Sequence, residues 1–119
     1  MRMAMVKFVK VLRIEMEDLE ADLEFLVAEN YRRQEAHEES ERVCLENVAT
    51  LRNEALGVQH FVEILDGVEV DNFDNLDHLV ATIRQRCHDV ITRRGLAEAA
   101  SAYADRKIAK VEAYMTDSS

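Results

Sequence analysis

The sequence contains no proline, no tryptophan and only three glycines in 119 residues. A globular chain of this length has on average about six prolines and about eight glycines. Because these two residues supply many tight turns, their scarcity speaks against sheet-rich folds, and three isolated glycines cannot form a glycine-rich phosphate loop. The chain is therefore expected to be mostly helical, with few connections.

Cysteines and long apolar runs are also scarce. Cys44 and Cys87 are too few and too far apart for a disulfide framework, so both are predicted to be small core residues. No apolar run approaches the roughly 18 residues that a membrane span needs. Lys7, Lys10 and Arg13 interrupt the apolar start, and no small-residue cleavage site follows, unlike a secretory signal. We expect a cytoplasmic protein that does not bind membranes.

The sequence is rich in acidic residues, with 24 Asp and Glu against 15 Lys and Arg, for a net charge of −9. Non-specific nucleic-acid binding depends on clustered Lys and Arg, so we expect no nucleic-acid partner. Residues 1–14 carry a charge of +4, whereas residues 15–30 carry −7. This distribution predicts pairing between the basic ends and the acidic middle, solvated faces, or contact with a protein partner that has a basic surface.

Apolar spacing predicts helices along most of the chain. In the first segment, apolar residues follow one another in steps of four and three: Met5, Val9, Leu12, Met16, Leu19, Leu23 and Leu26. A second apolar seam begins at Cys44 and ends at Leu65 in a different phase, and residues 29–42 between the seams are mostly polar. Either one very long helix contains a stutter or the chain turns, and the polar gap favours a turn.

The second half of the chain contains clearer boundaries. Gly57 lies inside the second seam, where a helix is predicted to kink or end, and stronger breaks follow at residues 66–73 and at Gly95. We predict one all-α domain over residues 1–119. Its helices are expected at roughly 4–30, 41–66, 75–94 and 96–115. They are expected to form a four-helix bundle or a long helical hairpin with two additional shorter helices.

Four carboxylates form a pattern that points to catalysis. Glu35 and Glu38 are three residues apart, and Glu63 and Asp66 repeat this spacing after 24 intervening residues. Two helices that each present acids one turn apart can hold Mg²⁺ against a triphosphate. The spacing is similar to the carboxylate signature of all-α nucleoside-triphosphate pyrophosphohydrolases, although a position usually acidic there is Gln34 here. The resemblance implies a Mg²⁺-dependent hydrolase with these four residues as metal ligands.

The residues of another catalytic site common in helical bundles are missing. Carboxylate-bridged di-iron sites use Glu-x-x-His pairs, because this spacing brings both side chains to one helix face. The residues three positions before the four histidines are Gln34, Gly57, Asn75 and Gln85, none of which is acidic. We therefore lean towards a protein that is not an enzyme and has no cofactor, with Mg²⁺ entering only with the hydrolase alternative.

The start of the first helix has more apolar surface than one seam requires, since residues 3–14 are apolar nearly all round. Such a helix is normally buried on several sides, within a bundle or between subunits. The leading hypothesis is a non-enzymatic helical interaction or assembly protein that forms a homodimer. The predicted interface consists of Met5, Phe8, Val9, Leu12, Met16 and Leu19.

Overall fold

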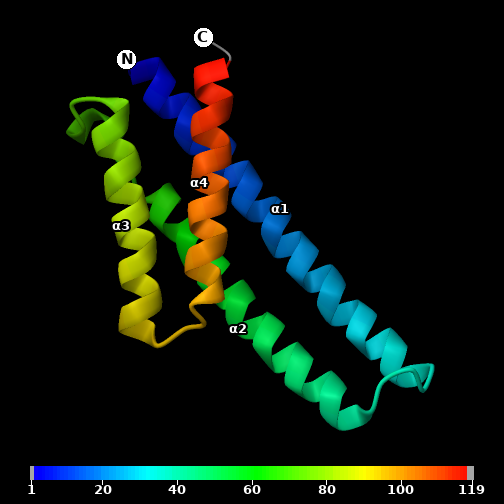
Figure 1. Ribbon diagram of the computed structural model, residues 1–119. Helices are drawn as coiled ribbons and strands as arrows, with labels where there is room; N and C mark the ends of the chain where they lie inside the picture. Colours follow the sequence, from blue (N-terminus) through cyan, green and yellow to red (C-terminus); the bar gives the residue numbers. More distant parts are fainter. Residues whose placement is uncertain (1, 118–119) are drawn as a thin grey trace.

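The computed structural model describes residues 2–117, which form four α-helices, one short 3-10 helix and no strand. The helices are α1 (Arg2–Glu35), α2 (Glu41–Asp66), α3 (Leu76–Arg94) and α4 (Ala99–Asp117), with η1 (Val70–Asn72) between α2 and α3 (Figure 1). The all-helical prediction is confirmed. Within the described residues, no helix has both the length and the apolar content needed to cross a membrane.

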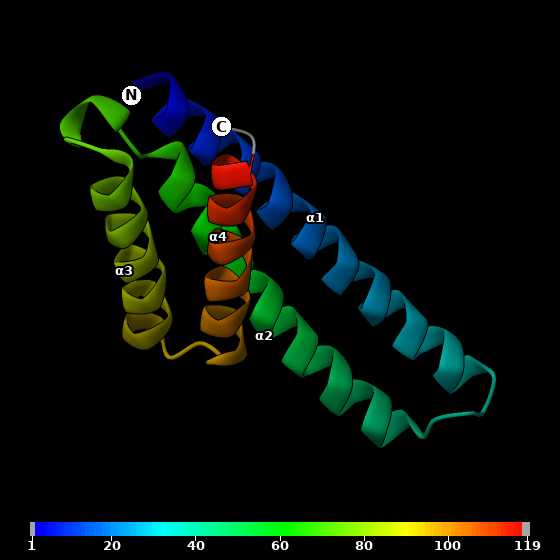
Figure 2. The ribbon, with the colours of Figure 1, turned by 45° about the horizontal axis from the view of Figure 1, so that its top comes forward.

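The helices differ in length, and this determines their arrangement. α1 and α2 form a long antiparallel hairpin, while α3 and α4, with 19 residues each, pack against one half of it (Figures 1 and 2). This covered half contains the start of α1 and the end of α2. The distal half, formed by the end of α1, the turn after it and the start of α2, extends beyond α3 and α4 (Figure 2). The molecule is accordingly elongated, with principal extents of 54 × 31 × 18 Å.

The chain turns between α1 and α2 at residues 36–40, which we call the hairpin turn, so the predicted turn is confirmed. Ser40 caps α2 by accepting a hydrogen bond from the Val43 amide at 3.2 Å. α1 extends five residues beyond its expected end at residue 30. Ion pairs that Arg32 and Arg33 form with Glu29, three and four residues earlier, support these last turns.

Apolar side chains from all four α-helices form the main core in the covered half. A small second cluster in the distal half contains Val27, Cys44 and Val48, so this part is held by the α1–α2 seam alone. Both cysteines are buried, which confirms their prediction as core residues. Burial, with a smaller contribution from Asp105, raises the pKa of Cys87 to about 12. The neutral thiol therefore packs like a small apolar side chain.

Gly57 does not kink or end α2, contrary to the sequence-based expectation, because α2 continues to Asp66. The residue is instead buried where α2 meets α3 and α4. A Cβ atom on Gly57 would lie 2.8 Å from the Ala100 Cβ and 3.0 Å from the Ile91 Cδ1. The missing side chain therefore lets α4 approach α2 closely.

We predict that Gly57→Ala destabilises the fold. Alanine gains about 1 kcal/mol of helix propensity, but overpacking costs about 1–3 kcal/mol. Because the contact at 2.8 Å involves a Cβ that cannot move without its helix, the free energy of unfolding in urea should fall by about 1 kcal/mol or more. Gly67→Ala is the control, since its Cβ would meet carbonyl oxygens at 3.7 Å and should change stability by less than about 0.5 kcal/mol. An unchanged or more stable Gly57→Ala protein would contradict this account.

Candidate interaction surface

On the side of the hairpin that carries α3 and α4, apolar side chains remain exposed beyond these two helices. Phe8 of α1 and Phe61 of α2 are both 0% exposed in the main core. Leu26 lies eighteen residues after Phe8, and Val43 lies eighteen residues before Phe61. Eighteen residues are five complete helical turns, so each pair points to the same side of its helix. Leu26 is 43% exposed and Val43 is 45% exposed; the connection before α4 meets α2 at Asn53, through the Ala97 amide, ten residues after Val43.

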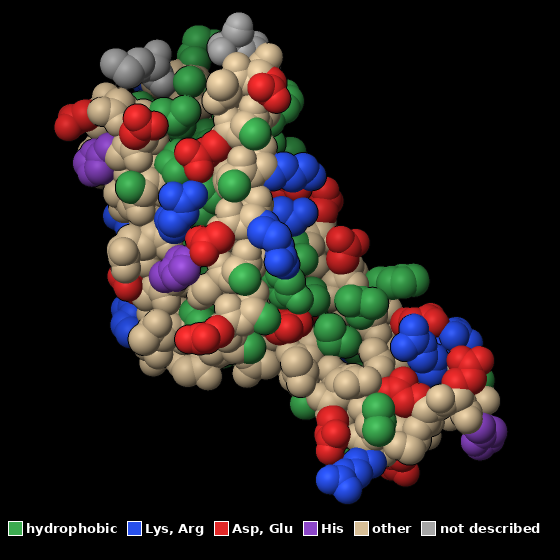
Figure 3. All heavy atoms as spheres, in the orientation of Figure 1, with side chains coloured by type: hydrophobic (Ala, Val, Ile, Leu, Met, Phe, Trp, Pro, Cys, Tyr) green, Lys and Arg blue, Asp and Glu red, His purple; other side chains and the backbone are tan. Residues whose placement is uncertain are grey.

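We call this uncovered area the hairpin face, and its apolar residues are Leu19, Leu26, Val43 and Leu51. Leu19 and Leu51 are half-buried at its inner side, and Phe25 lies at its edge with 67% of its surface exposed. Figure 3 shows hydrophobic side chains gathered along α1 beside the lower end of α4, between a basic edge of α4 and the charged hairpin turn. Large exposed apolar patches on soluble proteins typically mark contact surfaces.

Ion pairs fix α4 beside the hairpin face. Lys107 and Lys110 donate hydrogen bonds to the same Glu15 oxygen, at 3.1 and 2.8 Å. The hydrogen bond from Lys110 is the largest cause that lowers the pKa of Glu15 below its usual range. Arg13 also pairs with Asp66 at 2.7 Å, so basic residues near both chain ends contact acidic residues of the middle within one chain. The position of α4, and hence where the hairpin face begins, depends on these contacts.

We predict that Glu15→Gln lowers stability at pH 7 and has little effect in acid. The folded-state pKa of Glu15 is lowered, so its ionised form contributes stability above the unfolded pKa of about 4.3, and the contribution disappears as pH falls through the folded-state pKa. The loss at pH 7 should be about 1 kcal/mol, as for a partly buried ion pair. Thermal unfolding should show a gap between the variant and the natural chain that closes below about pH 4. Glu24→Gln is the control, because Glu24 is exposed and has no ion pair in residues 2–117, and it should show no such gap. A stability loss in Glu15→Gln that did not depend on pH would contradict the ionic role of Glu15.

A polar cluster joins the hairpin turn to both helices. Asn30 is buried and donates a hydrogen bond to the Leu26 carbonyl at 2.8 Å. The Asn47 amide donates to Asn30 Oδ1 at 3.1 Å and to Glu39 Oε1 at 2.9 Å. The sequence pattern shows Asn30 only as the place where the apolar seam stops. In the structure, its side chain links α1 to α2 and fixes their register next to the hairpin face.

The structure does not bring the four predicted metal ligands together. Glu35 and Glu38 lie at the hairpin turn, whereas Glu63 and Asp66 lie in the last turns of α2. The 22 residues from the start of α2 to Glu63 correspond to about 33 Å of helix. No group of three or more His, Cys, Asp or Glu side chains within residues 2–117 is placed to hold a metal ion. The antiparallel turn at 36–40 separates the two acidic pairs, and the predicted metal site is not formed.

Most of the predicted interface residues are used inside the chain. Four of them are buried in the main core, namely Met5, Phe8, Leu12 and Met16. The other two, Val9 and Leu19, are half-buried. α2, α3 and α4 cover much of the apolar surplus at the start of α1, although Met3 and Ile14 stay exposed, and Phe25 and Leu26 add exposed apolar surface in the second half of that helix. Leu19 belongs to both sets and marks the inner end of the hairpin face.

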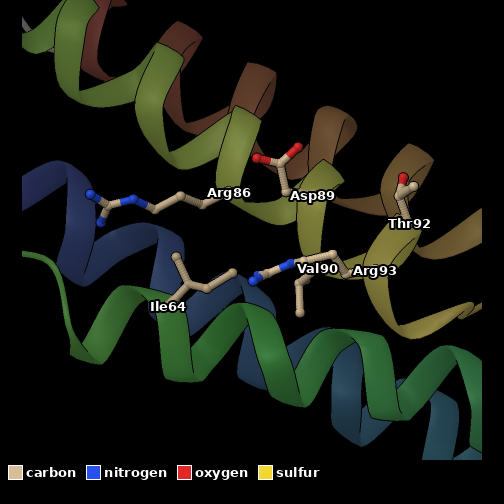
Figure 4. Close-up of a pocket in the computed structure, with 6 residues that line it drawn as sticks. All are labelled: Ile64, Arg86, Asp89, Val90, Thr92 and Arg93. Carbon is tan, nitrogen blue, oxygen red and sulfur yellow. The ribbon is translucent and has the colours of Figure 1, made fainter.

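A groove of about 530 Å³ lies between α2 and α3 (Figure 4). Arg86 and Arg93 extend along its side facing α2, beside Ile64, while Asp89 points away from this gap (Figure 4). Neither guanidinium has a carboxylate partner among the described residues, and Asp89 accepts a hydrogen bond from the Gln85 amide at 2.8 Å. The lower end of α3 is thus basic in a chain that is acidic as a whole.

The acidic block at residues 15–24 is divided between internal pairs and solvent. Glu15 and Glu17 pair with bases of the same chain. The other acids, namely Asp18, Glu20, Asp22 and Glu24, have no basic partner within the described part of the chain.

Neither a scan against protein-family models nor searches of curated proteins and of solved structures returned a match. A functional interpretation therefore starts from the structure itself, in which the hairpin face offers exposed apolar side chains.

Proposed function

We propose that this protein is a non-enzymatic helical assembly protein that forms a homodimer through the hairpin face. The proposal is supported by one observation above all, the apolar sides of α1 and α2 that continue uncovered beyond α3 and α4. Complete burial of a Leu or Val side chain contributes about 1.5–3 kcal/mol, so covering Leu26 and Val43 favours association.

A second copy of the chain offers a matching surface. The apolar sides of α3 and α4 are already used in the main core, through residues such as Ile83 and Ile108. The hairpin face is then the extended apolar surface that one copy presents to another. Contact between two identical surfaces is isologous and closes after two copies, which favours a dimer over a chain of subunits.

The hydrolase alternative has less support. It needs Glu35, Glu38, Glu63 and Asp66 to converge on one metal ion, and these residues lie at opposite ends of α2. A partner other than a second copy would also have to cover Leu26 and Val43. The oligomeric state in solution therefore tests the proposal directly.

We predict a dimer by light scattering at micromolar concentration, and a monomer for Leu26→Glu. A carboxylate at this position cannot be buried against an apolar partner without a large desolvation cost, so the dissociation constant should rise at least about tenfold. Leu56→Glu is the matched control, because Leu56 has the same 43% exposure as Leu26. It lies five residues before Phe61, about 140° round α2 and away from the hairpin face.

Leu56→Glu should stay dimeric, and circular dichroism should show that both variants keep their helix content. A natural chain that is monomeric at all tested concentrations would contradict the homodimer. Equal weakening by Leu26→Glu and Leu56→Glu would contradict the hairpin face as its interface.

A further inference from the structure

We infer that the two chains pair antiparallel about a two-fold axis, with the hairpin turn of each chain against the α3–α4 connection of the other. The hairpin turn comprises residues 36–40 and the connection comprises residues 95–98. The inference rests on the proposed homodimer and specifies its arrangement. It follows from the shape of the chain, the lengths of its helices and the charges at the two predicted contact points.

Shape excludes the parallel arrangement. α3 and α4 form a layer on one side of the hairpin (Figures 1 and 2), and the eighteen-residue spacing of Leu26 and Val43 from core residues places the hairpin face on the same side. If both hairpin turns pointed the same way, the α4 helices of the two chains would meet first. Packed helices lie about 8–10 Å apart, so two intervening α3–α4 layers would hold the hairpin faces well out of contact. An antiparallel pair has no such collision, because each α3–α4 layer then lies beyond the end of the other hairpin.

Helix lengths match this arrangement. The 34 residues of α1 correspond to about 51 Å, and the 19 residues of α4 to about 28 Å. The uncovered part of the hairpin is thus about 23 Å long. The distal half of the other chain has the same length, so it fills the space beyond α4. Its hairpin turn then reaches the lower end of α3 and α4, where the connection lies (Figure 1).

Opposite charges meet at this contact. The hairpin turn and the residues beside it contain four acids and no Lys or Arg between Gln34 and Glu41. Glu35 and Glu41 have no basic partner within residues 2–117. At the other contact point, α3 ends with Arg94, which has no carboxylate partner in the described residues either, while the equally unpaired Arg93 beside it extends along the α2–α3 groove (Figure 4). Antiparallel pairing brings these unpaired charges of opposite sign together twice, once at each end of the dimer.

Cross-linking between two single-cysteine additions tests the arrangement. Ala36→Cys places a thiol at the hairpin turn, and Ala97→Cys places one on the connection. The natural thiols do not compete, because Cys44 and Cys87 are buried and burial raises both pKa values. A tagged Ala36→Cys chain is mixed with an untagged Ala97→Cys chain, allowed to exchange subunits, and treated with a short bis-maleimide.

A product within one chain is not a concern in this design, because each chain carries one added cysteine. The two positions are also far apart in a single chain. The Ala97 amide donates to Asn53 at 2.7 Å, and Asn53 lies about 18 Å along α2 from the hairpin turn. We expect the tagged–untagged pair as the main product, and no product from Ala36→Cys chains alone.

A charge exchange supplies the second readout. Arg93→Glu with Arg94→Glu should weaken the dimer roughly tenfold, and Glu35→Lys with Glu41→Lys in the same chain should restore most of the affinity. The control is Arg52→Glu with Arg86→Glu, which makes the same change in net charge at two other exposed arginines without a carboxylate partner in the described chain. This control should weaken the dimer much less.

The outcomes separate the arrangement from the dimer itself. A monomeric natural chain would contradict both. A dimer that is sensitive to Leu26→Glu but forms no 36–97 cross-link would contradict the arrangement and leave the homodimer intact. A cross-link between two Ala36→Cys chains would indicate the parallel arrangement and also overturn the inference. Failure of the charge exchange to restore affinity would overturn the ionic contact.

Discussion

Two helices of 19 residues cannot cover a hairpin whose first helix has 34, and the rest of the structure depends on this difference in length. In the covered half, all four helices share a core, and α4 is held close by the missing side chain of Gly57 and by the lysine pairs on Glu15. In the distal half, the same apolar pattern continues without a cover. The boundary between core and exposed surface is therefore set by where α4 begins, at Ala99, and not by any change in the character of α1.

The distal half contains few buried apolar side chains, since its core is the small cluster around Val27 and Val48. Other contacts must therefore hold its two helices in place. Hydrogen bonds among Asn30, Asn47 and Glu39 fix the turn and the register of the two helices. A buried polar contact tolerates little sliding, because a shift would leave an amide without a partner. The distal hairpin thus keeps a defined shape while its apolar side stays exposed, as a preformed contact surface requires.

Local sequence pattern determines much of this fold, which is why helix identity and the turn at residues 36–40 could be predicted from spacing and polarity. Features that depend on distant segments could not. Gly57 looks like a helix breaker until α4 brings Ala100 against it. Met5 and Phe8 look like interface residues until the later helices bury them, and Leu26 looks like a core residue although no helix reaches it. The separation of Glu35 from Asp66 follows from the direction of the chain after the turn, which spacing alone does not contain.

The distribution of charge agrees with an assembly that associates through one face and does not grow beyond two chains. The hairpin face contains four apolar residues, with the acidic Asp22 between Leu19 and Leu26 on the same side of α1, whereas Asp18 and Glu24 project from other sides without basic partners in the described chain. In the proposed dimer, both apolar faces are covered and the remaining outer surface is mainly acidic. With a net charge of −9 on each chain, further copies are repelled, while the arginines at the end of α3 offset this repulsion at the contact itself. The same charges that keep the assembly from growing thus favour one orientation of the two chains.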